Sequence, residues 1–393
     1  MATLSSSDPR SLRARASWRN RAWLAPAAAC RELLAEAGIG TEGQAPWDML
    51  VHDERVFERL LREGTLGLGE AYMDGLWDCA RLDELFCRAL RGGLEHRVRA
   101  RWDFMLAALA NRVFNRQSLR RAFEVGERHY DLGNDLFTAM LDPAMQYSCG
   151  YWARADNLVA AQQAKLELIA DKLRLVPGMR VLDIGCGWGG LAEFLARRHG
   201  VSVVGVTVSK EQAGLARTRC AGLAVDIRLA DYRSLDESFD RIVSVGMFEH
   251  VGPKNYRRYF EVAHRCLRRD GIFLLHTIGA LKPARAIDPW IDKYIFPNGM
   301  LPALTQIGRA AEGLFVMEDW HNFGADYDRT LMAWAENFRA AWPALSEHYD
   351  LRFRRMFEYY LLSCAGAFRA RDLQLWQIVF SPGGLSGGYR APR

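Results

Sequence analysis

The sequence predicts an α/β protein built on a doubly wound, mostly parallel sheet, with a smaller, mostly helical N-terminal domain. The first observation is the stretch 180–190, RVLDIGCGWGG, in which a short apolar, β-prone run passes directly into glycines. Apolar residues then recur at helical spacing at Leu191, Phe194 and Leu195, so a helix follows the glycine turn. The second observation is that strands and helices alternate from Gly178 onward, which is typical of a parallel sheet covered on both faces.

The part of the chain before this alternation is predicted to be a separate domain. We expect a helical, lipid-facing N-terminal domain over residues 1–120 and a catalytic domain over residues 121–393. Helices are predicted at 27–37, 53–63 and 81–90, each ended or followed by turn residues. The segment 66–78, LGLGEAYMDGLWD, is predicted to be rich in turns, with exposed aromatic side chains.

A basic segment closes the predicted N-terminal domain. Over residues 97–121, apolar side chains recur every three or four positions and arginines surround them, which predicts a basic amphipathic helix. Such a helix can lie in a membrane interface, or it can be a linker packed on a neighbouring domain. The pattern alone leaves both interpretations open.

The strands of the catalytic domain give the expected place of the site. They are predicted at 180–185, 201–207, 225–230, 240–245 and 271–278, with 314–323 and 373–381 as the last two. Two long helices, at 328–341 and 350–370, are predicted before the final strand. In sheets of this kind the ligand binds beyond the carboxyl ends of the strands.

Composition narrows the class of protein. Of the 393 residues, 50% are hydrophobic and 25% are charged, which is ordinary for globular domains and long enough for two of them. The 8 cysteines include no CxxC pair, so neither a zinc site nor a disulfide framework is indicated, and a reducing cytoplasm is expected. No metal is expected, and neither a signal sequence nor a membrane-spanning run is indicated. The net charge of +5 is compatible with anionic lipid or nucleic acid and does not choose between them.

The residues around the glycines favour one nucleotide ligand over another. The spacing Gly185-x-Gly187-x-x-Gly190 suits either NAD or S-adenosylmethionine. An NAD site needs an acid about 20 residues later, at the tip of the second strand, where this chain has Thr207 and Ser209. Asp231 and Tyr232 end the third strand and suit the amino group and ring of adenine. The sequence therefore predicts S-adenosylmethionine.

Further polar residues cluster at the strand ends. Glu249 and His250 follow the fourth strand, His276 ends the fifth, and Tyr327 lies in the motif FGADYD. The motif YSCGYW, residues 147–152, is predicted to fold over the ligand as a lid. Each of these residues could also have a purely structural role. An acid is favoured at the start of a helix, and a histidine can be buried in the core with its hydrogen bonds formed.

Taken together, these motifs resemble one enzyme family. The motifs YSCGYW, VLDIGCGWGG, VGVTVSKEQ, VSVGMFEHVG, FLLHTIG, FGADYD and CAGAFRARDLQLWQ occur in this order. The chain resembles the bacterial cyclopropane-fatty-acyl-phospholipid synthases over nearly its whole length, apart from residues 1–30 and 382–393. The related mycolic acid cyclopropane synthases lack the long N-terminal extension. One local departure is Gly150, where the family often has alanine.

The resemblance implies methylene transfer from S-adenosylmethionine to the cis double bond of an acyl chain in a membrane phospholipid, with bicarbonate as the base. It implies a cofactor site formed by Tyr147, Ser148, Asp183, Gly185, Gly187, Gly189, Thr207, Ser209, Gln212, Asp231 and Tyr232. It implies a bicarbonate site formed by Cys149, Glu249, His276, Ile278 and Tyr327.

Cys364 matches a cysteine proposed as catalytic in the family. An alkene supplies its own nucleophilic electrons, so we expect no thiolate to be needed. The resemblance also implies a homodimer with no nucleic-acid partner, located in the cytoplasm and peripheral on the inner face of the membrane.

Three alternatives remain at this point. The nearest is an acyl-chain methyltransferase that adds a methyl or methylene branch without closing a ring. The others are a lipid-binding protein with an inactive nucleotide fold and an NAD-dependent oxidoreductase. The intact glycines, Asp231 and Glu249 speak against the second, and the absence of a strand-tip acid speaks against the third.

Overall fold

The computed structural model describes residues 26–94, 133–284 and 286–393. The amphipathic helix predicted at 97–121 and the predicted domain boundary at residue 120 lie outside these ranges. Within them, no helix is both long enough and apolar enough to span a bilayer.

A seven-stranded sheet forms the centre of the catalytic region, in the order β5-β4-β3-β6-β7-β9-β8. All neighbouring pairs are parallel except those that β9 makes with β7 and β8. The strands are β3 (Arg180–Ile184), β4 (Ser202–Thr207), β5 (Val225–Leu229), β6 (Phe239–Val245), β7 (Leu267–Ala280), β8 (Val316–Asn322) and β9 (Leu373–Ser381). The chain builds outward from β3 to β5 and then returns to the other side of β3 with β6. The predicted doubly wound, mostly parallel sheet is confirmed, and all seven predicted strands are present.

Helices cover both faces of this sheet. In β3, Val181 belongs to a core shared with α10 and α11, whereas Leu182 belongs to a core shared with α13 and α15. This alternation follows from the period of two in a β-strand. The helices are α9 (Asn134–Met140), α10 (Leu158–Leu173), α11 (Gly190–His199), α12 (Lys210–Arg219), α13 (Tyr256–Cys266), α14 (Pro289–Tyr294), α15 (Leu304–Ala311), α16 (Ala325–Leu345) and α17 (Leu351–Arg369), with short 3-10 turns η1 (Tyr232–Ser234) and η2 (Phe248–His250).

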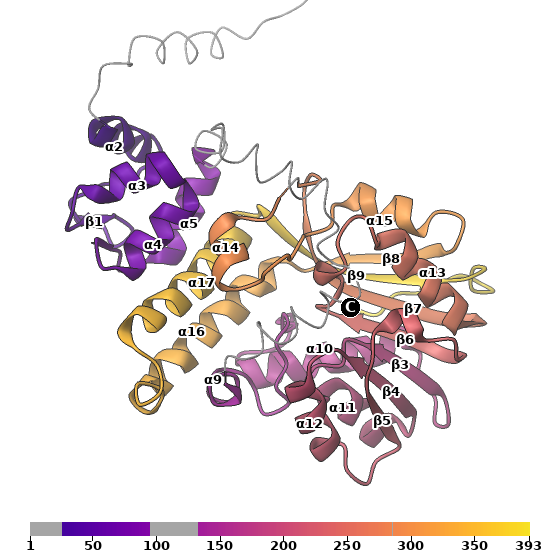
Figure 1. The fold of residues 1–393 in the computed structure, drawn as a ribbon. Helices are drawn as coiled ribbons and strands as arrows, with labels where there is room; N and C mark the ends of the chain where they lie inside the picture. Colours follow the sequence, from indigo (N-terminus) through magenta and orange to yellow (C-terminus); the bar gives the residue numbers. More distant parts are fainter. Residues whose placement is uncertain (1–25, 95–132, 285) are drawn as a thin grey trace, which may run out of the picture.

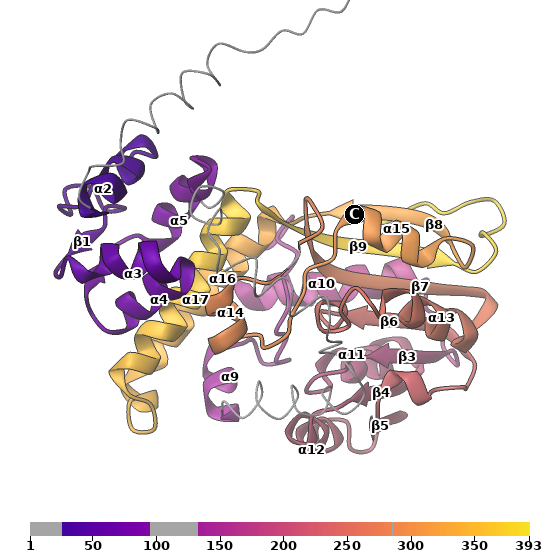
Figure 2. The ribbon, with the colours of Figure 1, turned by 45° about the horizontal axis from the view of Figure 1, so that its top comes forward.

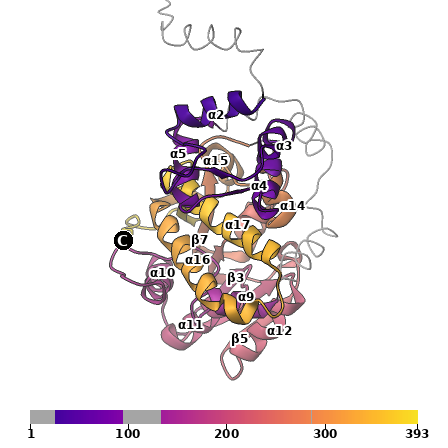
Figure 3. The ribbon, with the colours of Figure 1, turned by 90° about the vertical axis from the view of Figure 1, so that its left-hand side faces the viewer.

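The described part of the N-terminal region is helical, and its buried side chains belong to a core that it shares with other helices. It contains α2 (Pro26–Glu36), α3 (Arg55–Glu63), α4 (Thr65–Met73) and α5 (Leu82–Arg91), with the two-residue strands β1 (Leu50–Val51) and β2 (Trp77–Asp78). Figures 1 and 2 show these helices and the sheet on opposite sides of α16 and α17. One continuous cluster of buried side chains joins them to α14, α16 and α17, which run close together in Figure 3.

The prediction of a turn-rich segment at 66–78 with exposed aromatics is wrong. Residues 65–73 form α4, and Tyr72 and Trp77 are 5% and 0% exposed. The glycines that suggested turns serve close packing instead. A Cβ at Gly69 would lie 2.4 Å from the indole ring of Trp290, so only glycine lets α4 approach α14 this closely.

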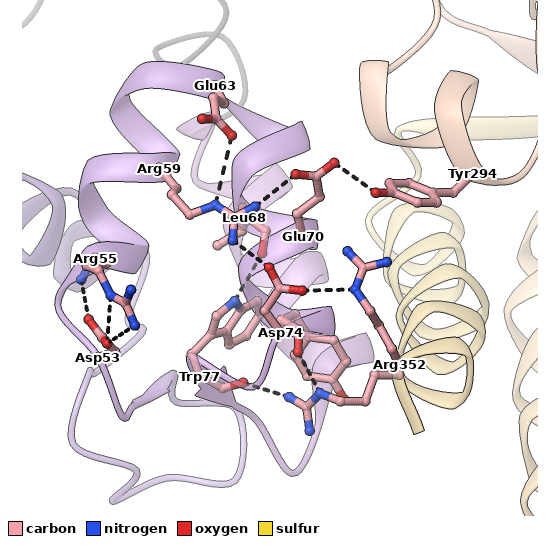
Figure 4. A network of polar contacts seen from close by, with 12 residues as sticks. Asp53, Arg55, Arg59, Glu63, Leu68, Glu70, Asp74, Trp77, Tyr294 and Arg352 are labelled. Atoms are coloured by element: carbon pink, nitrogen blue, oxygen red, sulfur yellow. Dashed lines mark hydrogen bonds and ion pairs between the residues drawn. The ribbon is translucent and has the colours of Figure 1, made fainter. Parts of the chain in front are cut away.

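Charged side chains link the N-terminal helices to the rest of the fold. Figure 4 shows Glu70 accepting from the Tyr294 hydroxyl at 2.8 Å and Asp74 accepting from Arg352 Nε at 2.9 Å. Arg59 donates to both of these acids from within the N-terminal region.

A more buried link lies at the other end of α17. Arg369 binds Asp328 of α16 through two parallel hydrogen bonds of 2.9 Å, and its remaining nitrogen reaches Asp83 of α5 at 2.5 Å. Asp83 has a side chain only 2% exposed, so this contact removes a carboxylate from water. Burial alone would raise the pKa of Asp83, but hydrogen bonds from Arg81 and Arg369 outweigh it and lower the pKa to about 2.

Arg369→Met should therefore destabilise the protein much more than Arg352→Met. The first change leaves a buried carboxylate without one of its two arginine partners and should cost about 3 kcal/mol of unfolding free energy. The second breaks a pair whose side chains are 46% and 35% exposed, which should cost about 1 kcal/mol or less. Urea unfolding followed by circular dichroism would measure both, and equal losses would contradict this ranking.

Candidate functional site

A large cavity of about 1140 Å³ lies at the carboxyl ends of β3 to β6, where the strand order reverses. Its polar end is lined by the glycine turn after β3 and by the loops after β4, β5 and β6. Its other end is mostly apolar and is lined by residues from α14, α16, α17 and the loop after β7. Thr65, Phe86 and Leu90 of the N-terminal region also contribute to the wall.

The glycine turn is fixed by the neighbouring strand and by a segment that crosses it. The backbone N–H groups of Gly185 and Cys186 both donate to the Val206 carbonyl, at 2.9 and 3.0 Å. Gly190 begins α11, and a Cβ there would lie 2.0 Å from the Ala144 carbonyl oxygen. The absence of a side chain at this position lets the segment 144–148 pass directly over the start of the helix.

Residues predicted to hold the cofactor interact with one another around the polar end. Ser209 caps α12 by accepting from the Gln212 N–H at 3.3 Å, and Thr207 Oγ1 donates to the Gln212 side chain at 3.0 Å. Asp231 accepts two hydrogen bonds from the Arg233 side chain, at 2.8 and 2.7 Å, and one from the Arg233 backbone N–H at 2.9 Å. Of the predicted cofactor residues only Gly189 does not line the cavity.

The segment 144–148 forms the wall opposite the glycine turn. Asp142 accepts from the backbone N–H groups of Ala144 and Gln146, at 2.9 and 2.8 Å, which fixes its start. Tyr147 and Ser148 line the cavity, and the Tyr147 hydroxyl contacts the Tyr360 hydroxyl at 2.9 Å. Of the predicted YSCGYW lid, the first two residues therefore line the cavity, whereas residues 149–152 do not.

Glu249 is a buried acid at the end of this cavity's polar part. Its Oε1 accepts the Ile278 N–H at 2.6 Å, while Oε2 has no hydrogen-bond partner among the described residues. Burial raises the pKa of Glu249 to about 7, against the opposing effect of the Ile278 N–H. Glu249 and Ile278 both line the cavity.

His276 lies behind that surface, fully buried on β7. Its Nδ1 is 3.2 Å from the Gln377 side-chain nitrogen, and its Nε2 has no partner among the described residues. Because an amide N–H donates, Nδ1 accepts, which leaves the ring proton on Nε2. Burial, with smaller effects from Lys165 and Lys172, lowers the pKa of His276 well below its usual value, so the ring is neutral.

The remaining predicted catalytic residues also lie either on the cavity wall or behind it. Tyr327 and Cys364 line the cavity, whereas Cys149 is fully buried behind it, with its Sγ 3.1 Å from the Gly150 carbonyl. Burial raises the pKa of Cys149 and Tyr327 well above their usual values and that of Cys364 to about 12. All three are therefore protonated at neutral pH.

Several residues that build the site were missed by the sequence analysis. Thr330 of α16 accepts the Gly150 N–H at 3.1 Å and the Trp152 indole N–H at 2.8 Å. Gln162 and Lys165 of α10 hold the segment 146–148 through side-chain hydrogen bonds. The available signal was the presence of two long polar side chains three positions apart on the buried face of a helix.

The described residues contain no group of three or more His, Cys, Asp or Glu side chains placed to hold a metal ion.

Comparison with known proteins identifies the family. The sequence model of the mycolic acid cyclopropane synthetase family matches residues 117–378. The chain is 61% identical over 362 residues to the cyclopropane-fatty-acyl-phospholipid synthase of Escherichia coli K12, covering 92% of this chain and 94% of that protein. The chain belongs to the cyclopropane-fatty-acyl-phospholipid synthase family. The resemblance drawn from the motifs is confirmed, and so is the prediction that the chain is an enzyme.

More distant members of the family show how far the likeness extends. The tuberculostearic acid methyltransferase UfaA1 of Mycobacterium tuberculosis is 33% identical over 359 residues, which is 85% of this chain and 83% of that protein. The cyclopropane synthase MmaA2 of the same organism has a solved structure that is 33% identical, with a TM-score of 0.62. The match covers 66% of this chain and 97% of the MmaA2 chain.

Two further structures bear on the fold and the cofactor. A solved structure of a mycolic acid cyclopropane synthase complexed with SAH and CTAB is 35% identical to this chain, with a TM-score of 0.61. The match covers 66% of this chain and 97% of that one. Coclaurine N-methyltransferase, at 19% identity and a TM-score of 0.65, shares the fold, with coverage of 80% and 98%. The predicted methyltransferase fold is confirmed for this synthase-family member.

The state of Cys364 can be checked directly in this synthase-family protein. A pKa of about 12 leaves very little thiolate at pH 8, so alkylation by iodoacetamide should be about 1000-fold slower than for a free cysteine. Mass spectrometry of the folded protein would measure this, with the urea-unfolded chain as the control. Rapid labelling of Cys364 in the folded protein would show a reactive thiolate and contradict this assignment.

Proposed function

We propose that this chain transfers a methylene group from S-adenosylmethionine to the cis double bond of an unsaturated acyl chain in a membrane phospholipid. The observation that carries the proposal is a single cavity with two ends of different chemistry. The glycine turn and Asp231 line a polar end that suits a nucleoside, and Ile291, Phe296 and Phe368 line an apolar end that suits a hydrocarbon. The 61% identity to a cyclopropane-fatty-acyl-phospholipid synthase supports the same reaction.

The chemistry joins the two ends of the cavity. The π electrons of the alkene form a bond to the methyl carbon of S-adenosylmethionine, and the carbon–sulfur bond breaks to leave S-adenosylhomocysteine. The acyl chain is then a carbocation. Loss of one proton from the transferred methyl closes the three-membered ring, so a base is needed within hydrogen-bond reach of that methyl.

We further propose bicarbonate as that base, which when bound would accept the proton from the methyl. The fit rests on two orphaned buried atoms, Glu249 Oε2 and His276 Nε2. The neutral His276 offers an N–H donor to the anion, and the carboxylate of Glu249 accepts its O–H. The protonated hydroxyl of Tyr327, which lines the cavity, is the further donor of this proposed binding site.

Side chains around the reacting carbons would protect the cation. Tyr327, Tyr360 and Phe296 line the cavity, and their aromatic faces attract positive charge. Their bulk also excludes water, which would otherwise trap the carbocation.

The lipid substrate bears on location and partners. An enzyme acting on acyl chains of membrane phospholipids has to reach a bilayer, so we propose peripheral association with the inner face of the bacterial membrane. The homodimer and the lack of a nucleic-acid partner stay predictions from the family resemblance.

The proposed reaction can be tested with isotopes. The purified protein would be incubated with unsaturated phospholipid vesicles and S-adenosylmethionine whose methyl is fully deuterated, and the acyl chains analysed by mass spectrometry. We expect one added carbon that retains two deuterium atoms and resists hydrogenation, because ring closure removes one methyl proton. Three retained deuterium atoms would indicate methyl branching, and no labelled lipid would contradict lipid alkylation altogether.

Glu249→Gln should lower turnover by about 10- to 100-fold, the equivalent of losing a hydrogen bond to a charged group. Binding of S-adenosylmethionine should remain within about threefold of wild type. In the wild type at fixed bicarbonate concentration, turnover should fall as the pH drops through about 7, because a protonated Glu249 no longer accepts the bicarbonate O–H. Steady-state assays across pH would measure this.

The matched control is Glu261→Gln, which changes an exposed acid of α13 paired with Arg257. It should leave turnover unchanged. Full activity in bicarbonate-free buffer, or loss of cofactor binding equal to the loss of turnover in Glu249→Gln, would refute the assignment of Glu249 to a bicarbonate site.

A further inference from the structure

Lys165 is a fully buried cation in the middle of α10 that lines no part of the cavity. Its neighbours on the helix are mostly apolar, and Gln162 lies one turn earlier on the same face. Lysine is almost never fully buried unless it is paired, so its surroundings call for a specific explanation.

The ammonium group binds the segment that forms the cofactor wall. Lys165 Nζ donates to Gln146 Oε1 at 2.6 Å and to Ser148 Oγ at 2.9 Å. Gln162 adds hydrogen bonds to the carbonyl oxygens of the same two residues, at 3.3 and 2.8 Å. Gln146 and Ser148 both line the polar end of the cavity.

The same segment is held closely from its other side. A Cβ on Gly190 would lie 2.6 Å from the Gln146 side-chain nitrogen and 2.0 Å from the Ala144 carbonyl. A small shift of residues 144–148 would therefore change the gap between this wall and the glycine turn. Lys165 and Gln162 are the side chains of α10 that set this gap.

The charge of Lys165 is offset by acids from two other elements. Asp142, which follows α9, has the largest electrostatic effect on the ammonium, followed by Cys149 and then by Asp183 of β3, whose own pKa burial raises to about 7. His276 of β7 also faces this charge. Burial nevertheless dominates and lowers the pKa of Lys165 to about 8, so the side chain is mostly protonated at pH 7.

We propose that protonated Lys165 is a positioning residue that fixes Gln146 and Ser148 against the glycine turn and thereby sets the affinity for S-adenosylmethionine. This inference rests on the proposed function, in which S-adenosylmethionine occupies the polar end of the cavity. Lys165 acts through the two wall residues and does not touch the cofactor itself.

The same helix supplies a matched control. Lys172 is also fully buried, two turns later, but its Nζ contacts His321 Nδ1 at 3.0 Å and lies 3.8 Å from Asp319. These partners belong to β8 and lie outside the cavity wall. Removing either lysine deletes a buried lysine side chain from α10, whereas only Lys165 contacts the segment 146–148.

The test is the affinity of the full-length protein for S-adenosylmethionine, measured by calorimetry at pH 7 without lipid. We expect Lys165→Met to raise the dissociation constant at least tenfold and Lys172→Met to change it less than twofold, whatever each does to the melting temperature. Lys165→Gln, which keeps one neutral donor and is the milder change for folding, should lie between wild type and Lys165→Met. An unchanged affinity in Lys165→Met, or an equal loss in Lys172→Met, would overturn the proposal.

A pH series from 7 to 9.5 tests the role of the charge. The affinity of the wild type should fall more steeply with rising pH than that of Lys165→Gln. The amine of the ligand titrates in both measurements, whereas Lys165 titrates only in the wild type. Identical pH dependence would contradict a role for the protonated side chain. No binding by the wild type would refute the proposed function itself, whereas normal wild-type binding with unchanged variants would refute only the role of Lys165.

Discussion

The reversal of strand order between β3 and β6 is the constraint on which the site depends. The chain leaves β3 toward β4 and leaves β6 toward β7, so the two loops part and open a space above the sheet. The glycine turn lies on one side of this space and Glu249 on the other. The hydrogen bond from the Ile278 N–H to Glu249 Oε1 ties the loop after β6 to the end of β7, and Oε2 has no partner in the part of the chain that the structure describes.

Local patterns predicted the parts of this arrangement that a short stretch of chain determines. The glycine turn, the seven strands and the position of Glu249 after a strand depend on neighbouring residues, so spacing was enough to find them. The contact between Lys165 and Ser148 depends on how α10 packs, and the pair Arg369–Asp83 joins residues 286 positions apart. No periodicity within a segment reports such contacts. The segment 66–78 was misread because glycine permits close packing as well as turns, and only Trp290 beside Gly69 distinguishes the two.

The N-terminal helices pack into the same core as the helices of the catalytic region and contribute to the cavity wall. Their buried side chains continue into α14, α16 and α17, and Phe86 and Leu90 reach the apolar end of the cavity. The structural match to the mycobacterial cyclopropane synthase MmaA2 covers 97% of the MmaA2 chain but only 66% of this chain.

Helix α17 both lines the cavity and holds the N-terminal region. Tyr360 and Cys364 face the cavity, while Arg355 and Arg369 of the same helix hold the N-terminal helices. A substitution in α17 that reshapes the apolar end of the cavity therefore also disturbs that interface. In the loop after β7, residues 281–284, 286 and 287 also line the cavity. Divergence in acyl-chain preference among close relatives should accordingly accumulate in this loop sooner than in α17.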